Sequence, residues 1–465
     1  MHRLRLKTSV FLLWIAGVCP VPAQTTMAPT DAEEAAAVAW FRAASHHFSD
    51  ATPSPAEADT FVKALGEARI YGLGEATHGG HQDQAFKSAV IKALVRAGHI
   101  DMLALECNRL GATGLDQYVR GGPGDVVALL RDRNFFGIWR NDEFAGLIVW
   151  LRAWNQTARQ PVRVVGVDNQ NANRDVAEAL AFIRLQDPSA YRRLAEPLQG
   201  MLSREGQEAK FYRWVIATPR QAFDQAATGI DAVTAELQSR RSDWGQVPGF
   251  DEALYAARVA RQGMHVFEME AGNPGVDLST LPVEYANRRD VAMAANLEAL
   301  SARQRVALWA HDSHVLSALD AQAQAHGYVT MGSELRRRIG SAYVSVGFAW
   351  SRGSFNAAVV SAANSGALAA QATLSPQSPP NDRDEDLGRV LARTDLPRFW
   401  IDLRLAPADV MAWGAKPTYR GWAGFAYDAT KWQSDPDDRM ALMPSHDFLV
   451  YFRTLTPSSL WPVVP

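Results

Sequence analysis

A short glycine-rich run concentrates side chains that could do acid–base chemistry. In YGLGEATHGGHQDQ, residues 71–84, Glu75, His78 and His81 stand among four glycines. Glu75 and His78 form E-x-x-H, a spacing that on a helix places both side chains on one face, as in di-iron bundles. The glycines instead favour a sharp turn after a strand, with close approach of the backbone to a ligand. The run is therefore an acid–base site, a metal site, or a turn that happens to contain histidines.

Four further ionisable residues follow apolar runs in the same way. Glu106 ends the run HIDMLALECNR, Asp168 ends PVRVVGVDNQ, and RVALWAHDSHV carries His311 and His314. Because ligands bind at the carboxyl ends of parallel strands, we expect these side chains to meet the glycine-rich run at one edge of a sheet. Structural alternatives exist, since an aspartate after a strand often caps the next helix and Glu106 could pair with Arg109.

These residue types permit several kinds of hydrolysis. Histidine and carboxylate ligands suit zinc, but neither H-E-x-x-H nor another familiar metal spacing occurs. The G-x-S-x-G motif of serine hydrolases is also missing. Direct attack by water remains, with a histidine as general base, a carboxylate that orients it, and a second histidine or a cation that stabilises the oxyanion. No cofactor is expected, and a metal site built from the same histidines and carboxylates stays open at this point.

The elements that must position these residues form an α/β fold. Near-continuous apolar runs alternate with helix-like segments such as AFKSAVIKALVRAG and DEFAGLIVWLRAWNQ. This alternation is typical of a parallel sheet covered by helices on both faces. The sequence predicts a mostly parallel sheet flanked by helices, an αβα sandwich, with a helical insertion and a smaller α+β C-terminal part.

The pattern of apolar and polar residues changes along the sequence and divides the chain into segments. Residues 24–169 form the first part of the α/β catalytic domain, and helical spacing throughout 170–300 predicts an insertion that forms a lid or a wall of the cleft. Residues 301–361 return to the α/β domain. Residues 362–386, rich in Ala, Ser and Pro, are predicted to be a mobile loop. The strands of 387–465 complete the sheet or form a small α+β subdomain.

The first residues are typical of a secretory signal peptide. A basic start, MHRLRLK, precedes the apolar SVFLLWIAGV, and VPA supplies small residues before a cleavage site after Ala23. The apolar run is too short to span a bilayer, so no stable membrane insertion is expected. Residues 1–23 therefore predict a periplasmic or secreted protein.

Composition excludes some classes of partner. The net charge of the 465 residues is −3 and no basic block stands out, which argues against nucleic acid. After cleavage only Cys107 remains, so neither an intramolecular disulfide nor a cysteine metal site is expected. We interpret Cys107 as a core residue.

Several motifs, in order from about residue 69 to 356, resemble the erythromycin esterase family. They are GLGEATHG, ALEC, YVRGG, WRNDEFAGLIVWLRAWN, VVGVDNQ, NRRDVAMAANL, LWAHDSHV and MGSELRRRIGSAYVSVGFAWSRGSF. The resemblance implies metal-free hydrolysis of a macrolide lactone ester in the antibiotic-resistance members. It implies that His78 is the general base that activates water, that Glu75, Glu106 and His311 support it, and that His314 lies close by.

The chain departs from the family pattern at several positions. Lys87 stands nine residues after His78, where the family typically has arginine. Gln82 and Asp83 replace an acid and an aromatic residue, and Asp312 replaces an asparagine. These changes leave the base intact and put the substrate pocket in doubt.

Further residues are assigned to substrate binding or transition-state stabilisation. Arg289 matches a family arginine at the cleft, although an ion pair with Asp290 or a position on the helix surface is the alternative. Lys87 and Asp168 complete this set. His81 is placed at the rim. Three tryptophans are interpreted as helix core rather than sugar-stacking platforms: Trp139, Trp150 and Trp154.

The sequence thus predicts an exported carboxylic ester hydrolase of the erythromycin esterase type. Its partner would be a small ester or lactone, with a macrolide as the leading substrate and antibiotic resistance as the leading role. Two alternatives stay open: a non-enzymatic binding protein of the cell envelope, and a metallohydrolase that uses the same His/Glu cluster. The oligomeric state is not predicted.

Overall fold

The computed structural model describes residues 31–131, 135–203, 208–273, 281–359, 373–381, 383, 386–429, 432 and 439–461. The predicted signal peptide, residues 1–23, lies outside the described residues. Within them, no helix is both long enough and apolar enough to cross a membrane.

A large sheet forms the centre of the molecule. Within the described residues it has eight strands, in the order β1-β9-β13-β6-β2-β5-β3-β4. The strands from β13 to β4 are parallel, and β9 runs antiparallel to both β13 and β1. Their bounds are β1 His46–His47, β2 Ile70–Leu73, β3 Met102–Asn108, β4 Arg163–Asp168, β5 Val306–Trp309, β6 Tyr343–Gly353, β9 Arg398–Asp402 and β13 Phe448–Leu455.

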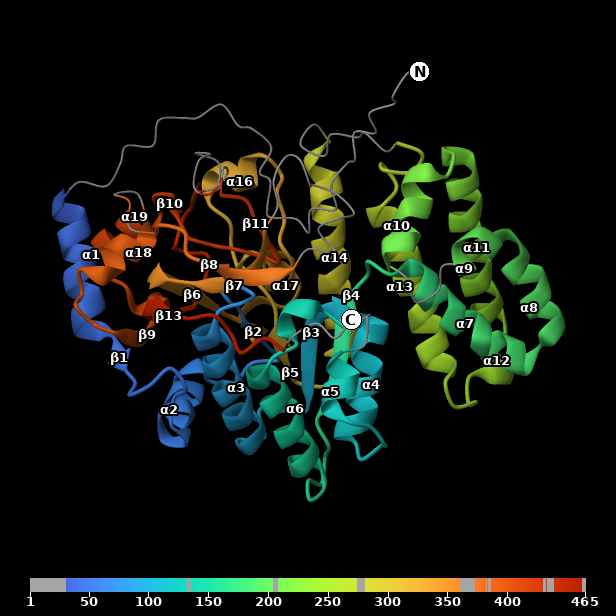
Figure 1. Cartoon of the computed structure of the whole chain (residues 1–465), viewed down its shortest axis with the longest axis horizontal. Coiled ribbons are helices and arrows are strands. Elements are labelled where there is room, and N and C mark those ends of the chain that lie inside the picture. Colours follow the sequence, from blue (N-terminus) through green and yellow to red (C-terminus); the bar gives the residue numbers. More distant parts are fainter. Residues whose placement is uncertain are drawn as a thin grey trace.

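Helices cover both faces of this sheet, which confirms the predicted αβα arrangement. Side chains along a strand alternate between faces, so Leu103 and Leu105 of β3 enter one hydrophobic core while Met102 and Ala104 enter the other. The first core is closed by α2 Pro55–Leu65, α3 His81–Arg96, α4 Arg109–Val119 and α6 Asp142–Asn155, which lie below the sheet in Figure 1. The second core is closed by α14 Val283–Leu300 and α17 Met331–Ile339.

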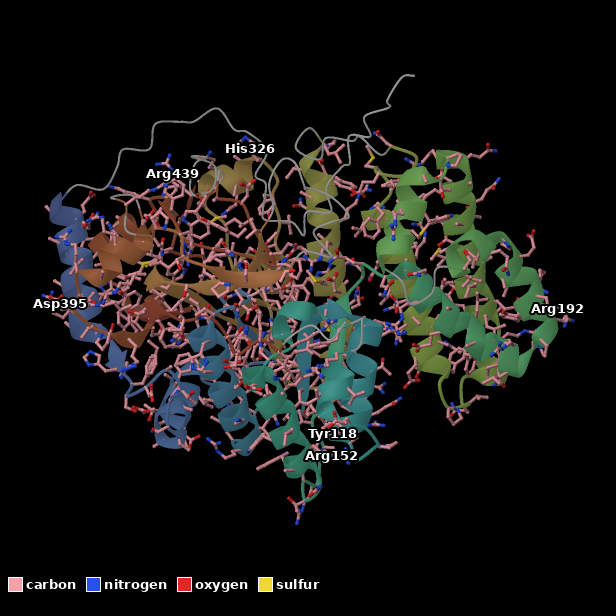
Figure 2. The ribbon with its side chains drawn as sticks, viewed as in Figure 1. Tyr118, Arg152, Arg192, His326, Asp395 and Arg439 are labelled. Carbon is pink, nitrogen blue, oxygen red and sulfur yellow. The ribbon has the colours of Figure 1, made fainter. Side chains whose placement is uncertain are left out.

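Contacts between the lower helices hold that layer together. Figure 2 shows Tyr118 of α4 and Arg152 of α6 side by side at the bottom of the view. The Arg152 guanidinium lies 4.2 Å from the centre of the Tyr118 ring and donates to the Gly122 carbonyl oxygen at 2.8 Å. This contact joins α4 to α6.

The structure divides the predicted helical insertion, residues 170–300, into two parts. The helices from α7 to α13 lie at the right of Figure 1 and surround a hydrophobic core of their own. In contrast, Met293 and Leu297 of α14 pack on the sheet. The bounds of the first part are α7 Ala172–Gln186, α8 Pro188–Ala195, α9 Gln199–Leu202, α10 Glu208–Ala217, α11 Arg220–Ser239, α12 Arg241–Trp244 and α13 Phe250–Val266.

The C-terminal region adds strands to the main sheet and builds two small sheets. In one, β7 Phe355–Val359 pairs with β8 Leu374–Gln377 and with β11 Ala426–Tyr427; in the other, β10 Thr418–Tyr419 pairs with β12 Arg439–Met440. The predicted mobile loop, 362–386, lies mostly outside the described residues, but β8 falls within it. The remaining helices are α1 Asp31–Ala44, α5 Val126–Leu130, α15 Asp312–Val315, α16 Ala321–Ala325, α18 Leu387–Ala392 and α19 Ala408–Gly414.

Candidate functional site

The candidate site lies at the carboxyl ends of four adjacent parallel strands. Glu75 and His78 are in the loop after β2, and His311 follows β5. Glu106 lies near the end of β3 and Asp168 is the last residue of β4. The structure therefore brings together side chains that the sequence separates by more than two hundred residues.

The loop between β2 and α3 is a hydrogen-bonded turn rather than a piece of helix. The Asp83 carboxylate accepts hydrogen bonds from the backbone N–H groups of Ala76 and Thr77, at 3.1 and 3.2 Å. The C-terminal segment adds two backbone bonds, from His78 N–H to the Ala423 carbonyl at 3.2 Å and from Ala423 N–H to the Ala76 carbonyl at 2.9 Å. Asp83, which replaces a family aromatic residue, thus holds the turn that presents His78.

Glu75 is clamped by three donors. Its Oε1 faces both His78 Nδ1 and, at 3.3 Å, the Trp139 indole N–H, while its Oε2 pairs with Lys87 Nζ. Glu75 and Lys87 are fully buried, and Lys87 Nζ lies 4.0 Å from the centre of the Trp309 ring. We call Glu75, His78, Lys87 and Trp139 the Glu75 clamp. Lys87 therefore contacts Glu75 and an indole, where the sequence analysis assigned it to substrate.

The clamp selects the tautomer of His78. A carboxylate only accepts, so the proton of a neutral His78 ring sits on Nδ1 and its lone pair on Nε2. No hydrogen-bond partner is assigned to Nε2 in the described part of the chain, whereas Nδ1 is engaged. The ring is walled by Phe136, Trp139 and His311, whose ring centres lie 5.1, 5.8 and 5.0 Å away.

A second group of charges lies beside the clamp. Arg289 of α14 donates from Nε to Asp168 Oδ1 at 3.1 Å and from Nη2 to Asp168 Oδ2 at 2.8 Å. Its Nη2 also reaches Glu106 Oε1 at 2.9 Å. His314 lies between Glu106 Oε1, 3.1 Å from Nε2, and Asp290 Oδ1, 2.8 Å from Nδ1. We call Glu106, Asp168, Arg289, Asp290 and His314 the Arg289 cluster.

This geometry decides between the alternatives for three residues. Arg289 is 8% exposed and pairs with Asp168 and Glu106 rather than with Asp290 or solvent. Asp168 holds this arginine, and Asn171 is the N-cap of α7. Arg109 pairs with Asp175 at 3.0 Å, so it is not the partner of Glu106.

Charges in the Arg289 cluster stabilise one another. Burial raises the pKa of Glu106, but His314 and Arg289 outweigh it and hold that pKa well below its usual range. Burial lowers the pKa of His314, but Asp290 and Glu106 outweigh it and raise that pKa to about 10. At neutral pH the cluster therefore contains an ionised Glu106 and a protonated His314.

His311 connects the two groups as a neutral imidazole. Its backbone N–H donates to Glu106 Oε2 at 2.9 Å. The Ser313 N–H lies 3.2 Å from Nδ1 and the Ala76 carbonyl lies 3.2 Å from Nε2, so Nε2 carries the proton. Burial, reinforced by the neighbouring His78, lowers the pKa of His311 well below its ordinary value.

Several residues of the site carry no signal that sequence reasoning could use. Trp139 was interpreted as core; it is fully buried, but it also donates to Glu75. The Trp422 ring lies 6.1 Å from the His311 ring, and Phe425 packs on Phe136 at 5.7 Å. Trp422 and Phe425 come from the C-terminal segment, which is far from the other site residues in sequence and is brought to them by folding.

Other predicted residues lie outside the centre. His81 begins α3 and pairs with Glu143 at 2.6 Å with a third of its side chain exposed, which places it at the rim. Cys107 is buried. Trp150 and Trp154 stack on each other, 5.5 Å apart, and are partly buried. In the part of the chain that the structure describes, no group of three or more His, Cys, Asp or Glu side chains has metal-binding geometry.

Solved structures share this fold. A protein from Bacillus cereus superimposes with a TM-score of 0.76 at 21% identity, covering 93% of this chain and 100% of its own. A succinoglycan biosynthesis protein gives 0.71 at 15% identity, with coverage of 93% and 100%. The erythromycin esterase EreC, as a histidine-to-asparagine mutant in its open conformation, gives 0.66 at 18% identity, with coverage of 89% and 97%. At these identities the likeness establishes the fold.

Similarity in sequence indicates the family as well as the fold. The chain is 23% identical to an erythromycin esterase type I from Escherichia coli over 195 residues, which are 39% of this chain and 45% of that protein. The alignment thus spans less than half of that relative. The model of the erythromycin esterase family matches residues 95–455, a range that contains the Arg289 cluster and His311 and begins after His78 and Lys87. With most of its length matched, the chain belongs to the erythromycin esterase family.

Proposed function

We propose that the chain is a hydrolase that cleaves an ester or lactone by direct attack of a water molecule activated by His78. Membership in the erythromycin esterase family supports hydrolysis of that type. The observation that carries the role of His78 is its orientation: Nδ1 is held on Glu75 and Nε2 is left without a partner among the described residues.

In the proposed reaction, His78 Nε2 takes one proton from water while the resulting hydroxide attacks the carbonyl carbon. The positive charge on the imidazole is stabilised by Glu75, whose position is held by Lys87 and Trp139. The tetrahedral intermediate collapses, the C–O bond to the alcohol breaks, and the proton returns from Nε2 to the leaving alkoxide. No covalent intermediate with the protein forms.

The leading substrate is a macrolide lactone, and other lactones and esters are the next to test. The name of the Escherichia coli relative supports this choice. The aromatic side chains around His78 and His311 supply apolar surface that suits a large aliphatic ring. Export through the segment 1–23 is part of the proposal, and the mature N-terminus and the cell fraction that contains the protein would test it.

The test is mass spectrometry of purified protein incubated with macrolides, simple lactones and simple esters. We expect a product heavier by one water from at least one compound, and none with His78→Asn, which keeps a similar shape and removes the base. A parallel sample treated with chelator should keep its activity. Loss of activity with chelator would favour a metallohydrolase. Equal binding of a compound by both proteins, with no turnover, would favour a binding protein.

A further inference from the structure

A second polar group lies beside His311 and takes no part in the proposed reaction. The Trp422 indole N–H donates to Asp312 Oδ2 at 3.1 Å, and the Arg420 guanidinium lies over the Trp422 ring, 4.8 Å from its centre. The centre of the same ring lies 6.1 Å from that of His311. Arg420, Trp422 and Asp312 thus form one connected group next to His311.

Arg420 is buried with most of its donors unused. It is 2% exposed, and among the described residues its one hydrogen bond is a long contact of 3.4 Å from Nη1 to the Ala441 carbonyl oxygen. Its Nε and Nη2 are buried and have no acceptor in that part of the chain. Burying the donors of a charged group without acceptors is unfavourable. In the described part of the chain, the edge of this guanidinium formed by Nε and Nη2 is therefore without an acceptor.

Two other arginines show what that edge binds in this protein. Arg289 uses Nε and Nη2 to hold both oxygens of Asp168, at 3.1 and 2.8 Å. Arg404 uses the same two nitrogens to hold both oxygens of Asp402, at 2.8 and 2.6 Å, and it also lies over an aromatic ring, that of Phe448, at 4.5 Å. Nε and Nη2 form a planar fork that matches a carboxylate.

Asp312 does not bond to this edge in the described structure. Its Oδ2 accepts from the Phe348 N–H at 2.8 Å and from Trp422, whereas its buried Oδ1 has no hydrogen-bond partner among the described residues. Burial raises the pKa of Asp312 to about 7, although Arg420 opposes the shift. Asp312 thus acts on Arg420 through its charge, and no hydrogen bond from Asp312 occupies the edge formed by Nε and Nη2 among the described residues.

We infer that Arg420 forms a binding site for a carboxylate group, held in two bonds by its Nε and Nη2. A substrate or product of the site, or a separate small acid, could supply this carboxylate. The inference does not rest on the proposed hydrolysis, because binding can be measured without turnover.

The experiment compares acetate with acetamide, which has the same shape and no charge. Each is titrated into the full-length mature protein at constant ionic strength, and binding is followed by calorimetry and by the melting temperature after long incubation, because the site is buried. We expect saturable binding of acetate only. Arg420→Met should weaken it by about tenfold or more, as a charge-assisted pair is lost. Arg404→Met removes an arginine that also lies on a ring and should leave acetate binding unchanged.

Two further measurements decide the result if Arg420→Met folds poorly. Asp312→Asn keeps the arginine and should bind acetate at least as tightly as wild type, because an amide cannot become an anion that repels the ligand. A crystal structure of wild type in acetate should show the carboxylate on Nε and Nη2. Equal responses to acetate and acetamide, unchanged binding by Arg420→Met, or only water molecules at the fork would overturn the inference. Competitive inhibition of ester turnover by acetate would assign the carboxylate to substrate or product, and non-competitive inhibition to a separate acid.

Discussion

The two charged groups at the edge of the sheet use the same residue types in opposite ways. In the Glu75 clamp, three donors converge on one carboxylate and leave His78 Nε2 without a partner among the described residues. In the Arg289 cluster, both nitrogens of His314 face carboxylates and Arg289 contacts three of its neighbours. A base needs a lone pair that the protein does not use. We therefore propose that the clamp transfers the proton and that the Arg289 cluster joins α14 to the ends of β3 and β4. The predicted catalytic roles of Glu106 and His314 stay predictions.

The largest expected effect follows from changing the carboxylate of the clamp. Glu75→Gln should lower kcat by roughly ten-thousandfold, the scale found when the orienting acid of a catalytic triad becomes an amide. The reason is that an amide can donate to Nδ1 and so move the proton to Nε2. The measurement is steady-state turnover of whichever ester the mass-spectrometric panel identifies.

A control separates this effect from damage to the fold. Glu75→Gln also leaves the buried Lys87 unpaired, so its melting temperature should fall. The double variant with Lys87→Met should recover stability and not turnover. Recovery of both would show that Glu75 acts only as a partner of Lys87.

The same type of change in the Arg289 cluster should act on stability. Arg289→Met leaves Asp168 buried without its cation and removes one of the two cations beside Glu106, and should lower the free energy of unfolding by about 3–5 kcal/mol. Arg288→Ala, at the neighbouring position and paired with the partly exposed Glu268, should cost about 0–1 kcal/mol. Urea unfolding of both variants measures the difference. Similar losses of unfolding free energy in the two variants would contradict the structural role proposed for the Arg289 cluster.

The pH dependence of stability should report His314. Its folded-state pKa is raised to about 10, above the ordinary value of the unfolded chain, so the folded state binds the proton more tightly. Its contribution is complete below about pH 6.5 and is lost as the pH rises towards 10, by at most ~1.4 kcal/mol per pH unit. Denaturant unfolding between pH 7.5 and 10 should show this decline in wild type. His314→Gln should flatten it, and an equal decline in both proteins would contradict the assignment.

The smallest expected effect comes from the third donor of the clamp. Trp139→Phe keeps an aromatic ring against His78 and removes one hydrogen bond to Glu75, worth about 1 kcal/mol, so kcat should fall about fivefold. Trp150→Phe, on the stacked pair away from the site, serves as the control and should leave kcat unchanged. We expect the pH profile of kcat/KM to shift in Trp139→Phe. If Trp139 had only a structural role, the melting temperature of this variant would change and its pH profile would not.

The sequence predicted those parts of the site that depend on which residues directly follow each strand. Strands followed by acids and histidines meet at one edge because parallel strands align their carboxyl ends, so Glu75, Glu106 and His311 could be placed together in advance. What each side chain touches could not. Trp139 reaches Glu75 across 64 positions, Trp422 reaches Asp312 across 110 and Arg289 reaches Asp168 across 121. No periodicity reports such contacts, because they depend on packing between whole elements.

The resemblance to the family also predicted positions in the fold without predicting contacts. It marked Lys87 and Asp83 as departures from a pattern, which directed attention to the substrate. The structure shows Lys87 on Glu75 and Asp83 on the backbone of the turn, so both contact the residues that hold His78 in place. Matching a residue to the family pattern predicts its position in the fold. Its contacts have to be observed in the structure.

The central claim concerns one proton on one ring, and nitrogen NMR tests it most directly. Protein labelled with ¹⁵N in its histidines, compared with His78→Asn to assign the signals, reports which ring nitrogen of His78 carries hydrogen. At a pH where the ring is neutral, we predict a protonated Nδ1 and a bare Nε2, with the tautomers redistributed in Glu75→Gln. A wild-type ring with its proton on Nε2 would contradict the account, because that atom could not then accept a proton from water.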